Sequence, residues 1–104
     1  GAMSTGKYVL VDKKPVPEND LMTWARWFET ADRQVAADTI DDVRVSTVFL
    51  GLDHSFGVGP PLIYETMVFG GLLDQEQDRY PTREEAEAGH RAMVERVKDA
   101  AKNC

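Results

Sequence analysis

Two stretches in the middle of the chain have the residue pattern of β-strands. Residues 43–50, VRVSTVFL, and residues 62–69, LIYETMVF, are rich in β-branched and aromatic side chains, and glycines bound both stretches. Residues 51–61 join them, so the pattern predicts an antiparallel hairpin. Apolar residues fall on both faces of each strand, which a sheet covered by helices on one face does not require.

The last part of the chain has the pattern of an amphipathic helix beginning at Thr82. Thr82 and Glu85 form a capping box, and Lys98 and Lys102 lie near the end, where they complement the helix dipole. His90 falls near the centre of the apolar face, so we expect it to point at the sheet. A histidine in such a place is usually a core residue with hydrogen-bonded ring nitrogens. At a helical spacing the rest of that face consists of Ala86, Gly89, Met93, Val94, Val97 and Ala101.

The first part of the chain predicts a strand over residues 7–12 and a helix over residues 21–32. Between them the sequence KKPVPEND contains two prolines, which are expected to break any regular element. Asn19 or Asp20 is suited to cap the helix. Trp27 lies at the edge of its apolar arc, where tryptophan either covers the rim of a core or anchors a contact with a partner. The arc itself consists of Leu21, Trp24, Ala25 and Phe28.

The remaining segments complete the predicted topology. Gln34–Ala37 is expected to be a short strand followed by a turn through Asp38–Asp42, and residues 70–81 a long connection. The order β-α-β-β-β-α predicts an α+β fold, with an antiparallel sheet of three to four strands and both helices on one face. We expect one domain over residues 7–104, preceded by a tag remnant and disordered start over residues 1–6.

Composition and charge exclude several classes of function. The 104 residues include 18 acidic and 12 basic ones, giving a formal net charge of −6, which opposes binding to nucleic acid. Nucleic-acid contact would need a basic cluster formed by residues such as Lys13, Lys14, Arg44 and Arg79. No apolar run approaches the roughly 20 residues of a membrane span, and the first residues lack a charged segment followed by an apolar one, so we expect neither a membrane span nor a signal peptide. The single cysteine, Cys104, fits a reducing compartment. These features predict a cytoplasmic protein.

Four polar residues invite a catalytic or metal-binding interpretation. Asp53, His54, Glu65 and His90 are suitable residue types, but their spacing matches no known catalytic or ligand pattern, and the Gly-x-Gly of residues 57–59 leads into prolines and a strand instead of a helix. We therefore predict no catalysis, no metal and no cofactor, with Asp53 and His54 serving the turn. The alternative is a small-ligand site or enzyme in which these four side chains converge.

The setting of Glu65 depends on which face of the sheet the helices cover. Glu65 shares a strand face with Ile63, Met67 and Phe69. If that face is covered, Glu65 needs a buried partner such as His90, Arg44 or Arg79. If it is open, the apolar residues beside Glu65 are exposed and resemble an interface.

Three strings of this sequence carry a family resemblance. The strings VRVSTVFLGLDHSFG, GPPLIYETMVFGG and RYPTREEAEAGH, within residues 43–90, resemble a family of small proteins encoded by bacteriophages and prophages that has no assigned activity. The segment WARWFETADRQVA is a further part of the resemblance. It implies a setting in the cytoplasm of a bacterial host and transfers no catalytic residue.

Together these features predict an accessory protein of phage origin that acts by binding another protein. The expected partner is a host factor, a component of a defence system, or a second copy of this chain in a homodimer. The binding surface is expected on a sheet face or on the loop rim around Phe56 and Val58. The candidate interaction residues are Trp27, Asp53, His54, Phe56, Val58, Glu65, Arg79, Tyr80 and His90.

Overall fold

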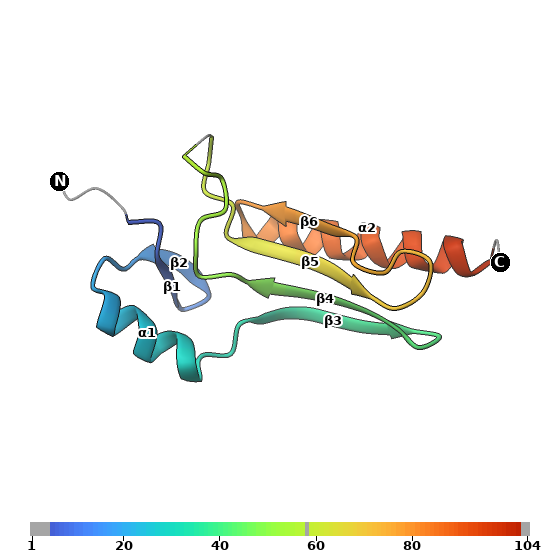
Figure 1. The fold of residues 1–104 in the computed structure, drawn as a ribbon, viewed down its shortest axis with the longest axis horizontal. Helices are drawn as coiled ribbons and strands as arrows, with labels where there is room; N and C mark the ends of the chain where they lie inside the picture. Colours follow the sequence, from blue (N-terminus) through green and yellow to red (C-terminus); the bar gives the residue numbers. More distant parts are fainter. Residues whose placement is uncertain (1–4, 58, 103–104) are drawn as a thin grey trace.

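The chain folds into two antiparallel sheets and two helices (Figure 1). The computed structural model describes residues 5–57 and 59–102. β1 and β2 form a two-stranded sheet, and β3 to β6 form a four-stranded sheet in the order β3-β4-β5-β6. The predicted α+β class is therefore confirmed. The elements are β1 (Tyr8–Val11), β2 (Lys14–Pro17), α1 (Leu21–Thr30), β3 (Gln34–Ile40), β4 (Val43–Phe49), β5 (Tyr64–Phe69), β6 (Gln77–Tyr80) and α2 (Arg83–Lys102).

The helix α2 covers one face of the four-stranded sheet. It contacts all four strands, and its buried residues are Ala86, His90, Met93 and Val97, as the spacing of the sequence predicted. The predicted hairpin is also confirmed, since β4 and β5 pair antiparallel. Residues of these two strands and of α2, with Ile63 just before β5, form two apolar clusters. One contains Val45, Val68, Met93 and Val97, and the other contains Phe49, Ile63, Tyr64 and Ala86.

The helix α1 does not lie beside α2 on the sheet, which corrects the predicted arrangement. It packs against β1 at one end of the molecule, as Figure 1 shows. The Trp24 indole donates hydrogen bonds of 3.1 Å to the carbonyl oxygens of both Tyr8 and Gly51. Because these acceptors belong to β1 and to the segment after β4, they hold α1 at the end of the sheet. Asp20 caps the helix, its carboxylate accepting from the Met22 amide at 3.1 Å.

The proline-containing segment forms the strand β2, although it was predicted to break regular structure. Pro15 pairs with Leu10, and Pro17 pairs with Tyr8. The turn between β1 and β2 has two residues, so hydrogen-bonded pairs alternate outward from Val11 and Lys14. Both prolines then occupy positions whose nitrogen points away from β1, where a missing N–H group needs no partner.

The strand β3 is longer than predicted, because its turn is tighter. It runs to Ile40, and the turn consists only of Asp41 and Asp42, whose φ angles are 47° and 71°. A two-residue turn with both φ angles positive is the type I′ turn that joins tightly paired strands. A bulge lies near the start of β3, between Gln34 and Ala36.

The strand β6 was missed within the predicted connection over residues 70–81. Its four residues, QDRY, are polar and carry no apolar alternation, so the sequence contains no strand signal. β6 is ordered because it pairs with β5, placing Arg79 opposite Glu65 and Asp78 opposite Thr66.

Candidate functional site

The four polar residues singled out in the sequence do not converge. Glu65 pairs with Val48 of β4, and Val48 lies between two residues of β4 that face the helix. Because successive side chains point to opposite faces and paired residues share a face, both Val48 and Glu65 point to the open face of the sheet. His90 lies beneath α2, on the opposite face. Asp53 and His54 lie in the loop after β4. These positions do not form one catalytic or ligand-binding constellation.

His90 joins the helix to the sheet through both ring nitrogens. Its Nε2 lies 2.7 Å from Oδ2 of Asp38, and its Nδ1 lies 2.7 Å from Oγ1 of Thr47. Thr47 Oγ1 in turn lies 2.5 Å from Oγ1 of Thr66. A neutral imidazole with its proton on Nε2 satisfies this chain, donating to Asp38 and accepting from Thr47. The prediction that His90 points at the sheet is confirmed, whereas its partners had no signal in the sequence.

The carboxylate, imidazole and hydroxyl of this network are the groups of a catalytic triad. Unlike those of a triad, the hydroxyl groups are not accessible to a substrate. Thr47 and Thr66 are 0% exposed, and His90 is 3% exposed. Only the Asp38 carboxylate, with 56% of its side chain exposed, reaches solvent. A nucleophile has to reach its substrate, and these hydroxyl groups are sealed beneath α2. The network therefore serves to fix α2 in position on the sheet.

Tyr80 extends the same buried cluster from β6. Burial raises the pKa of the Tyr80 hydroxyl, as does the nearby Asp78 carboxylate, while a hydrogen bond with Thr66 opposes the rise. Gly89 of α2 leaves room for the ring, since a Cβ atom there would lie 2.7 Å from Cε1 of Tyr80. Tyr80 thus acts in packing at this position.

The open face of the sheet carries an ion pair beside apolar side chains. The Arg79 Nε donates to Oε2 of Glu65 at 3.0 Å, and the Glu65 side chain is 15% exposed. Phe69 is 47% exposed on this face, and Met67 is half-buried. Of the partners considered for Glu65, Arg79 is therefore the one that the fold supplies, and it does so across neighbouring strands.

Trp27 covers the rim of the core. Its ring packs edge-on against Phe49, with centroids 5.8 Å apart and an interplanar angle of 85°. It belongs to the partly buried residues around the cluster that contains Phe49 and Tyr64. Packing of this kind accounts for a tryptophan at the edge of the α1 arc.

Asp53 closes the loop that follows β4. One carboxylate oxygen accepts from the amides of Ser55 and Leu62 at 2.8 and 2.9 Å, and the other accepts from the Ser55 hydroxyl at 3.0 Å. The His54 amide also donates to the Leu62 carbonyl at 3.0 Å. Partial burial opposes ionisation of Asp53, but the three hydrogen bonds outweigh it and hold its pKa below the usual range. We call residues 53–62 the Phe56 loop.

Phe56 stands exposed at the tip of this loop. It is 89% exposed and has a φ of 56°, a backbone conformation that aromatic residues rarely adopt. Gly57 follows with a φ of 79°. Val58, the other predicted contact of the loop rim, lies outside the described residues. The loop therefore holds a large apolar side chain away from the core on a base closed by Asp53.

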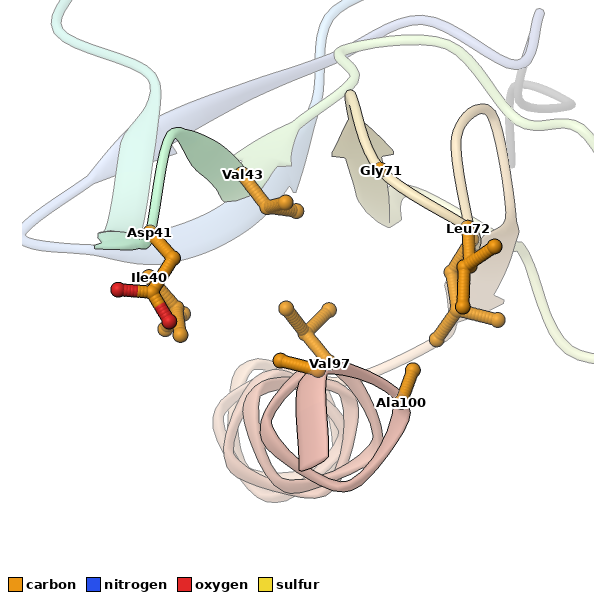
Figure 2. A pocket seen from close by; sticks show the side chains of 9 residues that line it. Ile40, Asp41, Val43, Gly71, Leu72, Val97 and Ala100 are labelled. Carbon is orange, nitrogen blue, oxygen red and sulfur yellow. The ribbon is translucent and has the colours of Figure 1, made fainter. Parts of the chain in front are cut away.

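A groove of about 450 Å³ lies at the opposite end of the molecule (Figure 2). Figure 2 shows Val97 and Ala100 of α2 facing the space between the β3–β4 turn and the segment after β5. Leu72, at its rim, is 72% exposed. Its lining is apolar apart from Asp41, and it contains none of the residues predicted as a site. The lining residues are Ile40, Asp41, Val43, Gly71, Leu72, Leu73, Val97, Ala100 and Ala101.

Within the described residues, no group of three or more histidine, cysteine, aspartate or glutamate side chains is arranged to hold a metal ion. No helix over this part of the chain is long and apolar enough to cross a membrane. Lys13 and Lys14 line a hollow together with Arg83 and Glu84 of α2, whereas Arg79 pairs with Glu65. Comparisons of the chain with models of known protein families, with curated proteins and with solved structures give no match.

Proposed function

We propose that this protein acts by binding another protein through the Phe56 loop. The observation that carries the proposal is the exposure of Phe56, which is 89% exposed at a strained φ of 56°. Burying a phenylalanine side chain contributes roughly 2 kcal/mol of favourable free energy, and the isolated chain does not gain it at this position. A partner with an apolar pocket would recover that free energy on binding.

The base of the loop supports the same proposal. Asp53 accepts three hydrogen bonds within the loop, and Ser55 is buried. A loop ordered before binding loses less conformational entropy when its partner arrives. Phe56 is thus presented on a pre-organised base, which suits an anchor residue at the centre of an interface.

The resemblance to phage and prophage proteins sets the expected partner in a bacterial host cell. In this proposal the chain is an accessory protein that binds a host factor or a component of a defence system, and it needs no catalytic group for that work. The separation of His90 from Glu65 on the two faces of the sheet supports binding over catalysis at these residues.

Affinity capture with matched variants tests the proposal. Wild type, Phe56→Ala and Leu72→Ala are immobilised and exposed to bacterial lysate, and the retained proteins are quantified by mass spectrometry. Leu72→Ala is the control, because Leu72 is 72% exposed but lies outside the Phe56 loop. We expect a partner that wild type and Leu72→Ala retain equally and that Phe56→Ala retains at least about 10-fold less, as for an interface anchor. Retention that is equal for all three proteins, or absent for all, contradicts the proposal.

A further inference from the structure

The core beneath the C-terminal half of α2 ends in an open groove. This is the groove of about 450 Å³ shown in Figure 2. At its base Val97 is 4% exposed, whereas Leu72 at its rim is 72% exposed. Ile40, Val43 and Leu73 pack against the same core cluster and are only partly buried. The groove therefore exposes apolar side chains that the fold itself does not cover.

Small residues keep the groove open. Ala100 and Ala101 follow Val97 on the groove side of α2, at positions where larger apolar side chains would fill the space. On the opposite wall Gly71 has a φ of 70°, and a Cβ atom there would lie 2.7 Å from Cγ2 of Val43. The backbone of residue 71 thus lies directly against Val43, and no side chain of residue 71 occupies the groove.

The lining of the groove suits a hydrocarbon chain. Apart from Asp41 and Gly71 it consists of aliphatic side chains, contributed by α2, by the β3–β4 turn with its flanking strand residues and by the segment after β5. Small-molecule sites in proteins are clefts of about 300 to 1,000 Å³ with mostly apolar linings, and the groove has a volume of this order. Aliphatic contacts have no preferred direction, so they accept an alkyl chain whose torsions can adapt.

Two lysines lie at one end of the groove. Lys98 and Lys102 line a smaller hollow that has Ile40, Asp41 and Ala101 in common with the groove, so the two hollows adjoin. A ligand whose chain lies in the groove can therefore extend a polar head group to these lysines.

The charges at this end favour an anionic head group. Among the described residues that line the two hollows, Lys98 and Lys102 carry two positive charges, and Asp41 carries one negative charge. Lys98 Nζ lies 3.6 Å from Oε1 of Glu95, but both side chains are exposed, and such ion pairs are weak. Because an ammonium group has three N–H donors, Lys98 can bind a carboxylate and still contact Glu95.

We propose that this groove binds a fatty acid, that is, an unbranched alkyl chain that ends in a carboxylate. The alkyl chain lies on Val43, Leu72 and Val97, where it replaces water on apolar side chains. The carboxylate accepts charge-assisted hydrogen bonds from Lys98 and Lys102.

Titration with decanoate, followed by NMR of the backbone amides and methyl groups, tests the class of ligand. Decanol, which has the same alkyl chain and no charge, is the matched ligand. At about pH 7, where a carboxylic acid is ionised, we expect decanoate to shift the signals of Leu72, Leu73 and Val97. Decanoate should bind at least about 5-fold more tightly than decanol, as contacts with exposed charges provide. Unchanged signals of these residues, or decanol that binds as tightly as decanoate, would overturn the proposal.

Matched double variants test the end that holds the carboxylate. Lys98→Met combined with Lys102→Met is expected to weaken decanoate binding at least about 5-fold, to the level of decanol. Lys13→Met combined with Lys14→Met removes the same charge beside the start of α2 and is the control. It should bind decanoate within about 2-fold of wild type, because screening by salt limits charge effects over that distance. Equal losses in the two double variants contradict the proposal.

Ala100→Phe tests the groove itself. The larger side chain fills the space beside Val97, so decanoate and decanol should both bind at least about 10-fold more weakly. Ala88→Phe, at an exposed position of the same helix, is the control and should bind both ligands like wild type. Circular dichroism verifies that the variants are folded, and the exposed lysine variants decide the question if Ala100→Phe is not. A folded Ala100→Phe with wild-type affinity for decanoate would overturn the proposal.

Two further outcomes would assign the groove to another occupant and would also overturn the proposal. Signals of Leu72 and Val97 that shift with protein concentration alone would place a second copy of the chain there. A bacterial protein that wild type captures and Leu72→Ala does not would place a protein partner there. Phe56→Ala is expected to leave decanoate binding unchanged, so failure of the Phe56 loop as an interface and failure of the fatty-acid site are distinguishable.

Discussion

His90 on α2 and Asp38 on β3 are joined by a hydrogen bond of 2.7 Å, although 52 residues separate them in the sequence. The histidine end is 3% exposed, whereas 56% of the Asp38 side chain is exposed. The hydrogen bond therefore runs from the core to the solvent. The two partners should differ in how much they stabilise the fold.

Removing His90 is expected to destabilise the protein more than removing Asp38. His90→Leu removes a hydrogen-bond partner from the buried Thr47 hydroxyl and from the Asp38 carboxylate at once, and we expect the free energy of unfolding to fall by about 2 to 3 kcal/mol. Asp38→Ala opens the solvent-exposed end of the hydrogen bond, where water can replace the carboxylate as acceptor for His90 Nε2, and is expected to lower the free energy of unfolding by about 1 kcal/mol or less. Urea denaturation followed by circular dichroism measures both changes.

Arg91→Leu serves as the control for these variants, because Arg91 is the neighbouring exposed residue of α2. It is expected to change the free energy of unfolding by less than about 0.5 kcal/mol. An Asp38→Ala variant that loses as much stability as His90→Leu would show that the exposed end contributes equally.

Gly89→Ala is expected to lower stability although alanine favours helices. In an exposed helix the change would gain about 1 kcal/mol. Here the added Cβ would lie 2.7 Å from Cε1 of Tyr80, so Tyr80 or α2 must move. We expect a net loss of about 1 to 3 kcal/mol in the free energy of unfolding, measured by urea denaturation.

Ala88→Gly, at the exposed position beside it, is the reference for helix propensity. It should lose about 1 kcal/mol by propensity alone. A melting temperature of Gly89→Ala above that of wild type would mean that the approach of Tyr80 does not constrain residue 89.

The contribution of Asp53 to stability should depend on pH. Its folded-state pKa lies below its usual value because of the hydrogen bonds from Ser55 and Leu62, which outweigh partial burial. The ionised carboxyl thus stabilises the fold fully above about pH 4, and this contribution is lost as the pH falls through the lower, folded-state pKa. Asp53→Ala is expected to lose on the order of 2 kcal/mol at pH 7 and progressively less below about pH 4.

Urea denaturation between about pH 2.5 and 7, which spans the ordinary aspartate pKa, measures this difference. Asp99→Asn, which changes an exposed carboxylate of α2, is the control. Its difference in free energy of unfolding from wild type should not shrink as the pH falls. A stability difference between wild type and Asp53→Ala that is constant over this range would contradict the assignment.

Phe56→Gly should separate binding from stability. Glycine adopts the φ of 56° without the steric cost that phenylalanine has there. This gain offsets the cost of ordering glycine, which has a larger conformational entropy than phenylalanine in the unfolded chain. We expect Phe56→Gly to melt at or slightly above the wild-type temperature and Phe56→Ala not above it, while both lose the captured partner. Thermal melts and affinity capture on the same protein samples give the two readouts. A large drop in the melting temperature of Phe56→Gly would indicate that Phe56 packs on the protein itself.

Much of the fold follows from local sequence patterns. The face of α2 was predicted because its apolar spacing is regular from Ala86 to Ala101, and the β4–β5 hairpin because both strands are rich in β-branched residues. β2 and β6 were missed, since a proline-containing segment and a polar segment become strands only when a neighbouring strand pairs with them. The position of α1 was wrong because an amphipathic arc indicates that a helix packs, without indicating against which element.

The sequence by itself determined the α+β class, the Thr82 cap of α2 and the burial of His90, because these depend on residues within a few positions of one another, and it narrowed the cap of α1 to Asn19 or Asp20. Only the tertiary structure decided that Glu65 pairs with Arg79 on the open face while His90 meets Asp38 and Thr47 beneath α2. Pairing across a sheet depends on register, and register is set by turns and by long-range packing. The exposure of Phe56 and the open groove beside Val97 were decided in the same way, since both depend on which other elements come near them.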